Sequence, residues 1–282
     1  MANRRGERVK TLKKPEDRLD VFPAFVKVAD RRVLVVGHGG EAAAKVRLLG
    51  ETNAAIVVIA KVIEPDLREA IELFQAEHIA EDFRPVHLTD AALVFSARED
   101  WDLDKAVVDA ARIMGVPVNA VDKPELCDFY TGALVNRAPI AVAITSTGVG
   151  PVLSRHIRAR IEAMLPRATG ELARLAESFR DAATKVITDG ALRRNFWARF
   201  FSGSVATNLY AGKPETARAE AQRLLNGMAD EPGFVWLVGA GPGAEDLLTL
   251  RAQRLLQEAD VIVHDALVPA SVVAMGRRDA ER

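Results

Sequence analysis

The chain has 282 residues, enough for about two domains of ordinary size. Its 38 lysines and arginines nearly balance its 39 aspartates and glutamates, which argues against a uniformly basic surface for nucleic acid. Hydrophobic residues make up 49% of the chain, a content that favours a sizeable core and argues against global disorder.

The cysteine content and the amino-terminal residues bear on where the protein works. Cys127 is the only cysteine, so an internal disulfide is impossible, as is typical of the reducing cytoplasm. Residues 1–20 are basic but lack the apolar run of a secretory signal, and we expect a disordered tail. No stretch reaches the ~20 apolar residues of a membrane span. The histidines lie far apart in the sequence. We therefore expect a cytoplasmic protein without membrane contact or a zinc-type ligand cluster.

Residues 21–132 show strands that alternate with helices. Short apolar runs predict strands at residues 32–36, 55–59, 92–96 and 116–121, with a weaker strand at 86–88. Helical spacing is present at residues 41–50, 67–74 and 103–113. Such alternation implies an α/β domain, with a Rossmann-like parallel sheet of about five or six strands and helices on both faces.

The pattern changes after residue 132. A strand is expected at residues 140–144, and residues from about 152 to 228 are mostly helical, which defines a second domain over 133–229. An aromatic cluster in this domain is large for one helix layer: Phe196, Trp197, Phe200 and Phe201. We expect a homodimer through residues ~145–228, the alternative being burial within one chain. A new apolar strand at 234–238 opens a third, α/β segment over 233–282.

The first strand runs into a glycine-rich turn. Gly37, Gly39 and Ala42 form a G-x-G-x-x-A arrangement between a strand and a helix, typical of a dinucleotide pyrophosphate site. The acidic residue that usually holds the ribose is missing at the end of the second strand. Either backbone groups near Lys61 and Val62 bind the ribose, or the segment is only a tight turn. No arginine stands there to hold a 2′-phosphate, so we expect NAD⁺ to be preferred over NADP⁺.

Asp122 ends the apolar strand at residues 116–121. In open α/β sheets ligands lie outside the carboxyl ends of the strands, so this carboxylate is placed to face a ligand. A partly desolvated carboxylate there could accept a proton near neutral pH. The alternative is that Asp122 caps a helical turn at Lys123-Pro124-Glu125. The residues alone favour neither interpretation.

Together these motifs resemble the siroheme synthase family. The matching segments, in chain order, are RRVLVVGHGGEAAAKVRLL, VNAVDKPELCDF, PIAVAITSTGVGPVLSRHIRARIE and GFVWLVGAGPGAEDLLTL. The last is similar to the opening of the uroporphyrinogen-III C-methyltransferases, which use S-adenosylmethionine. The resemblance implies an NAD domain, a helical dimerisation domain and a methyltransferase segment. The residues after the boundary are fewer than an ordinary domain, so the methyltransferase is expected to be incomplete here.

The resemblance implies two reactions of the first two domains: NAD-dependent oxidation of precorrin-2 to sirohydrochlorin, and insertion of ferrous iron as a substrate. It assigns acid–base catalysis to Asp122, which shares its motif with Asn119. The remaining residues that it implies are NAD contacts at Gly40, Glu41, Lys61 and Val62, a phosphorylated serine at Ser146, an S-adenosylmethionine contact at Pro242 and a proton acceptor at Asp265. The alternative for Ser146 is a turn residue beside the tetrapyrrole cleft.

Some positions depart from the family pattern. His38 stands where the family has glycine, and Arg98 stands where it has a small hydroxyl residue. Arg98 either crowds the nicotinamide side or pairs with a substrate carboxylate. Four arginines could bind the tetrapyrrole carboxylates or form a solvated face: Arg137, Arg155, Arg158 and Arg160. The alternative function is a degenerate nucleotide-binding dimerisation module that scaffolds a methyltransferase without catalysis of its own.

Overall fold

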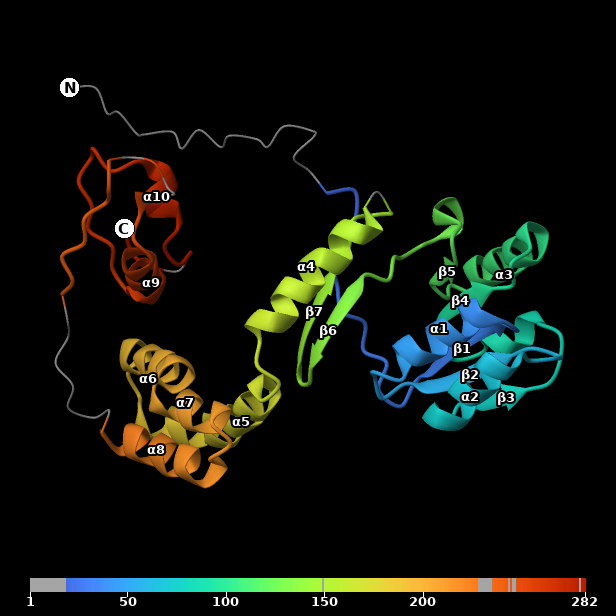
Figure 1. Ribbon diagram of the computed structural model, residues 1–282, viewed down its shortest axis with the longest axis horizontal. Helices are drawn as coiled ribbons and strands as arrows, with labels where there is room; N and C mark the ends of the chain where they lie inside the picture. The colour runs from blue at the N-terminus through green and yellow to red at the C-terminus, as the bar shows by residue number, and fades with distance from the viewer. Residues whose placement is uncertain (1–18, 149, 228–234, 243, 245–246, 279) are drawn as a thin grey trace, which may run out of the picture. The chain divides into compact units, whose positions relative to one another are not determined.

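The computed structural model describes residues 19–148, 150–227, 235–242, 244, 247–278 and 280–282 (Figure 1). The chain forms two compact units: Met1–Leu134 with Ala143–Arg158, and Val135–Val142 with Ala159–Arg282. Most of the expected disordered tail, residues 1–18, lies outside the described residues. The domain boundaries at 132/133 and near 229–233 stay predictions.

The first unit is built on a five-stranded parallel sheet with the strand order β3-β2-β1-β4-β5. Its strands are β1 (Arg32–Gly37), β2 (Ala55–Ile59), β3 (Glu77–Ile79), β4 (Ala91–Ala97) and β5 (Val118–Ala120). Val35 of β1 pairs with Val58 of β2 on one side and with Phe95 of β4 on the other. From β1 to β3 the chain adds strands on one side of β1, and from β4 onward it adds them on the other side. Open sheets of this kind bind ligands at the point between β1 and β4 where the order changes sides.

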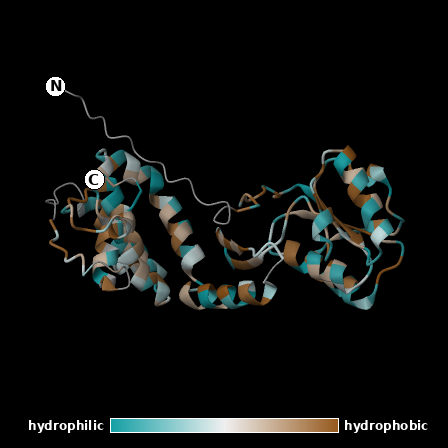
Figure 2. Ribbon diagram, turned by 90° about the horizontal axis from the view of Figure 1, so that it is seen from above, coloured by the Kyte–Doolittle hydropathy of each residue, from teal (hydrophilic) through white to brown (hydrophobic). Residues whose placement is uncertain are grey.

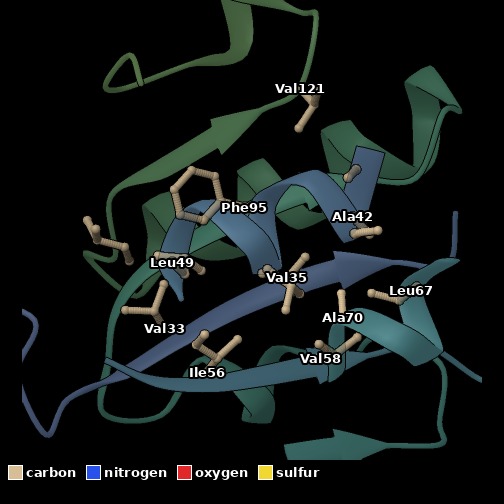
Figure 3. Packing of buried hydrophobic residues seen from close by; sticks show 14 of the residues in the cluster. Val33, Val35, Ala42, Leu49, Ile56, Val58, Leu67, Ala70, Phe95 and Val121 are labelled. Atoms are coloured by element: carbon tan, nitrogen blue, oxygen red, sulfur yellow. The ribbon is translucent and has the colours of Figure 1, made fainter. Parts of the chain in front are cut away.

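Helices cover both faces of this sheet, as the sequence predicts. They are α1 (Gly40–Leu49), α2 (Pro65–Phe74) and α3 (Trp101–Ile113). One core packs α1 and α2 against alternate residues of β1, β2 and β4, and Figure 3 shows its side chains meeting between the layers. The other core packs Val107, Val108 and Ala111 of α3 against the opposite sheet face. Each large side chain buried here contributes about 1.5–3 kcal/mol.

The strand expected at residues 86–88 is wrong. Pro85–Leu88 is a 3₁₀ helix, in which the backbone N–H of His87 donates to the carbonyl oxygen of Arg84 at 3.0 Å. Proline has no N–H to donate to a sheet ladder, and the adjacent side chains of His87 and Leu88 are both buried rather than alternating. The true edge strand, β3, is short and begins Glu77-His78, so it lacks an apolar pattern.

The residues after the sheet form a hairpin and then helices. Strand β6 (Ala133–Arg137), which the sequence analysis missed, pairs with β7 (Ile140–Ile144). The helices that follow are α4 (Pro151–Met164), α5 (Thr169–Val186), α6 (Gly190–Ser202), α7 (Ser204–Tyr210) and α8 (Pro214–Gly227). In Figure 2 these helices are banded in hydrophobic and hydrophilic colours, as amphipathic helices are.

The aromatic cluster of α6 is only partly explained by burial within the chain. Phe196 and Phe200 are fully buried in the helical core, so the single-chain alternative accounts for these two rings. Trp197 and Phe201 stack with centroids 5.8 Å apart, and 48% of Phe201 is exposed. Both line a largely apolar cavity of about 600 Å³ whose wall includes Arg180. Phe201 thus leaves apolar surface that a second copy of the chain could cover.

The last segment contains α9 (Leu250–Glu258) and α10 (Ala270–Ala274). The strand expected at 234–238 is wrong for its described residues: 235–238 form no strand, with Val235 91% and Leu237 100% exposed, while residue 234 lies outside the described range. An apolar run becomes a strand only when a neighbour satisfies its backbone hydrogen bonds, and no described strand does so here. Within the described residues, no helix combines the length and apolar character needed to cross a membrane.

Candidate active site

The first glycine turn lies at the carboxyl end of β1, the central strand of the sheet. A Cβ added to Gly37 would lie 2.2 Å from the carbonyl oxygen of Ala97, so only glycine lets β1 and β4 approach so closely. Gly39 precedes α1, and no side chain caps this helix. The first N–H groups of a helix without a side-chain cap suit a phosphate group. The turn therefore fits the pyrophosphate of a dinucleotide.

Two carboxylates that were not predicted from the sequence lie close to this turn. A Cβ at Gly39 would lie 3.1 Å from a Glu99 carboxylate oxygen and 3.3 Å from both carboxylate oxygens of Glu64. Glu99 follows β4 in the left-handed conformation, with φ 62°. Glu64 follows β2, and its backbone N–H donates to the carbonyl oxygen of His38 at 2.9 Å. Both lie beyond the strand ends, which is why the strand pattern alone did not reveal them.

Asp122 lies at the same edge of the sheet, just after β5. It is exposed and has a left-handed backbone, with φ 58°, a conformation that aspartate tolerates better than most residues. The 3₁₀ helix Pro124–Leu126 begins after Lys123 and has no side-chain cap. The capping alternative for Asp122 therefore lacks support, and its carboxylate accepts no hydrogen bond from the described residues.

Two residues of α1 share the electrostatic surroundings of Asp122. Burial raises the pKa of Glu41, and the charges of Asp122 and Glu99 raise it further. Burial lowers the pKa of Lys45, while Asp122 and Glu41 oppose that shift. The ammonium of Lys45 lies 3.5 Å from Thr131 Oγ1 and 5.9 Å from the ring centre of Phe95. A half-buried lysine near the acid–base candidate was not predicted, because helical spacing does not show which charged side chain turns inward.

A buried ion pair holds the segment that carries Asp122. The Asp104 carboxylate is fully buried and accepts from Lys123 Nζ at 2.7 Å, from the Ser96 hydroxyl at 2.5 Å and from the Arg98 backbone N–H at 3.2 Å. The hydrogen bond to Asp104 raises the pKa of Lys123. One carboxylate thus joins the ends of β4 and β5, two neighbouring strands of the sheet.

The other residues predicted in this unit occupy different settings. Lys61 and Val62 are exposed directly after β2, beside the end of β1. Asn119 is buried, and its amide donates to the Phe129 carbonyl oxygen at 2.8 Å and to Cys127 Sγ at 3.3 Å, which favours a scaffolding role. Ser146 is half-buried in a turn, where its hydroxyl oxygen accepts from the backbone N–H of Gly150 at 3.1 Å.

The four arginines suggested for substrate carboxylates do not share one setting. Arg137 donates to the carbonyl oxygens of Leu165 at 3.1 Å and Glu162 at 3.2 Å, so its guanidinium already serves the fold. The other three lie on exposed positions of α4: Arg155, Arg158 and Arg160. Across the residues that the structure describes, no group of three or more histidine, cysteine or carboxylate side chains is arranged to hold a metal.

The second glycine turn is open. A Cβ at Gly239 would meet nothing within 4 Å, and the strand expected before it is absent. Pro242 is exposed, and the Asp265 carboxylate accepts from the backbone N–H of Leu267 at 2.8 Å. No hydrogen bond between described residues joins the Pro242 and Asp265 segments. The methyl-transfer roles of Pro242 and Asp265 stay predictions.

Family models match three consecutive parts of the chain. They are described as "Putative NAD(P)-binding" for residues 24–133, "Sirohaem synthase dimerisation region" for 168–225 and "Tetrapyrrole (Corrin/Porphyrin) Methylases" for 235–282. The siroheme synthase of Methylobacillus flagellatus is 42% identical over 93% of this chain, and that of Nitrosomonas europaea is 42% identical over 94%. Over nearly its whole length, the chain is thus similar to siroheme synthases.

The chain spans 56% of the length of each of those two proteins. A solved structure of SirC, described as a precorrin-2 dehydrogenase, matches its fold with a TM-score of 0.61. The match covers 73% of this chain and 99% of the other, at 16% identity, and supports the fold alone. The α/β sheet domain, the helical region and the beginning of a methylase domain therefore follow one another as predicted.

Proposed function

We propose that the sheet domain binds NAD⁺ and oxidises precorrin-2 to sirohydrochlorin. The observation that carries this proposal is the arrangement of residues at the carboxyl ends of β1, β4 and β5. There an uncapped helix start and a glycine turn lie at the same sheet edge as a carboxylate without a hydrogen-bond partner among the described residues, Asp122. The curated relatives support the pathway, since they are named siroheme synthases.

The oxidation removes two hydrogens from the tetrapyrrole. NAD⁺, when bound, accepts one of them as hydride, with both electrons of the broken C–H bond. The other leaves as a proton, which Asp122 would accept and pass to solvent, because its side chain is exposed. The neighbouring Lys45 and Glu41 set the local charge. Precorrin-2 and NAD⁺ thus give sirohydrochlorin, NADH and a proton.

The same carboxylate suits the second reaction. Ferrous iron is a substrate here, and its insertion into sirohydrochlorin releases the two pyrrole N–H protons. Asp122 can take these protons one at a time, because the reaction needs a base and no change of oxidation state. We assign Gly40, Glu41, Lys61 and Val62 to NAD contacts, and Pro242 and Asp265 to the methylase segment that would use S-adenosylmethionine.

The helical region is proposed to join two copies of the chain. The match to a dimerisation region supports this, as do exposed apolar residues on α4 and α6. Val152, Leu153 and Met164 are exposed on α4, and Phe201 is exposed on α6. A monomer in sedimentation at micromolar concentration would contradict the dimer.

The catalytic proposal is tested by incubating the chain with precorrin-2 and NAD⁺ and recording the visible spectrum. We expect the spectrum of sirohydrochlorin to appear together with an equal amount of NADH. Adding ferrous iron should then give siroheme faster than in a protein-free control. If the chain binds NADH but neither product forms, the scaffolding alternative is the better account.

A further inference from the structure

Glu64 stands on one particular side of the glycine turn. It follows β2, and β2 is the neighbour of β1 on the side opposite to β4. Its backbone N–H donates to the carbonyl oxygen of His38 at 2.9 Å, which ties it to the turn itself. Both carboxylate oxygens then lie 3.3 Å from the position of a Cβ on Gly39. The carboxylate is thus held at the place where the dinucleotide backbone would pass.

The fold makes little use of this carboxylate. Glu64 occupies the capping position of α2, yet its side chain accepts no capping hydrogen bond from that helix. Its ion-pair contact among the described residues is His38 Nε2 at 3.9 Å, and both side chains are about half exposed. An exposed pair at that distance contributes little to stability. A carboxylate that neither caps nor pairs closely is available to a ligand.

We infer that the Glu64 carboxylate accepts hydrogen bonds from the adenosine ribose hydroxyls of the dinucleotide and selects NAD(H) over NADP(H). This inference rests on the proposed NAD binding and names the residue that discriminates between the cofactors. An acidic side chain after the second strand of such a sheet holds the ribose 2′-hydroxyl. A 2′-phosphate in the same place would bring a second anion against the carboxylate.

The Glu64 charge has two other conceivable effects on NADH binding. The same negative charge beside Gly39 could repel the pyrophosphate, or it could act only on the α2 dipole. The alternatives predict different changes in NADH affinity when the carboxylate is removed. A ribose ligand makes NADH bind more weakly when it is removed, whereas a repelling charge makes NADH bind more tightly. A side chain that acts only on α2 leaves binding unchanged.

The test is a fluorescence titration of the 282-residue chain with NADH and with NADPH. The variants are Glu64→Ala and Glu64→Gln, with Glu72→Ala as a control that removes an exposed carboxylate elsewhere on α2. Far-UV circular dichroism checks that each variant folds. We expect Glu64→Ala to weaken NADH binding by roughly 10-fold or more, as for lost hydrogen bonds to a charged group. NADPH binding should change less or improve, and Glu72→Ala should match the unsubstituted chain.

Each outcome bears on a different claim. Unchanged or tighter NADH binding by Glu64→Ala would overturn the assignment of Glu64 while leaving the proposed NAD site standing. Equal affinity of the unsubstituted chain for NADPH and NADH would overturn the selectivity. Failure of the unsubstituted chain to bind NADH would overturn the proposed function, and the inference with it.

Discussion

The chain contains the same local pattern twice, an apolar run followed by a glycine-rich turn, with different results. The first run becomes β1, paired on both sides, and its turn is packed so closely that Gly37 touches the backbone of β4. The second run stays unpaired at residues 235–238, and Gly239 has open space around it. We therefore expect a glycine motif to bind a ligand only when neighbouring strands fix the direction of its helix and backbone.

The largest expected effect is at Asp122, whose charge acts on Glu41 and Lys45 of α1. Asp122→Asn keeps the side-chain shape but removes the proton acceptor. Precorrin-2 oxidation should fall by roughly 10²–10⁴-fold, the usual contribution of a positioned general base. NADH affinity should stay the same. Asp102→Asn, at an exposed carboxylate in the first turn of α3, is the matched control. Turnover of Asp122→Asn at the unsubstituted rate would remove Asp122 from the mechanism.

Gly39→Val tests whether the first turn receives a pyrophosphate. The added side chain would meet only the movable carboxylate ends of Glu64 and Glu99, so the fold should survive. The space for the phosphates would be lost, and NADH binding should weaken by roughly 10–100-fold. Gly239→Val, in the open second turn, should leave NADH binding unchanged. Calorimetric titration of both variants measures the difference, and equal affinities would argue against a phosphate site at Gly39.

Gly37→Ala sharpens the comparison in terms of stability. Its Cβ would be forced to within 2.2 Å of a backbone carbonyl oxygen, so β1 or β4 must shift. We expect the free energy of unfolding of the sheet domain to fall by about 1–3 kcal/mol. Gly239→Ala should change it by less than about 0.5 kcal/mol, because nothing lies near. Denaturant unfolding followed by circular dichroism gives both values. An unchanged free energy of unfolding in Gly37→Ala would mean that β1 and β4 are less closely packed.

The smallest expected effect is on how the stability of the sheet domain depends on pH. Burial lowers the pKa of His87 below its ordinary value of 6.5, and the charge of Arg84 adds to the shift. The unfolded chain then binds the proton more tightly, so stability falls as the pH drops below about 6.5 toward the folded pKa. His87→Gln should reduce this fall in thermal unfolding between pH 8 and pH 5.5. An identical pH slope in both proteins would show that His87 does not contribute.

The sequence predicted those parts of the fold whose pattern is local. Apolar, β-branched runs located β1, β2, β4, β5 and β7, and helical spacing located α1 to α3. Strand β3 was missed because it begins with two polar residues, Glu77 and His78. Residues 86–88 were misjudged because the apolar Val86 and Leu88 flank His87, an alternation typical of a strand, although they belong to a 3₁₀ helix. The strand at 235–238 failed because pairing depends on neighbours that a local pattern does not contain.

The candidate site divides in the same way. Gly37, Gly39 and Asp122 were found because each belongs to a strand end. Glu64 lies near the turn because its loop folds back toward His38. The ion pair of Asp104 with Lys123 joins segments that lie apart in the sequence. Their residue types alone do not separate them from the many solvated charges of the surface.

The most direct test of the account is a pair of calorimetric titrations of the unsubstituted chain, one with NADH and one with S-adenosylmethionine. An assembled first turn and an unassembled second turn predict saturable binding of NADH, at one site per chain, and no saturable heat with S-adenosylmethionine. Saturable binding of S-adenosylmethionine together with no binding of NADH would contradict the central claim that packing against neighbouring strands turns the first glycine motif into the site.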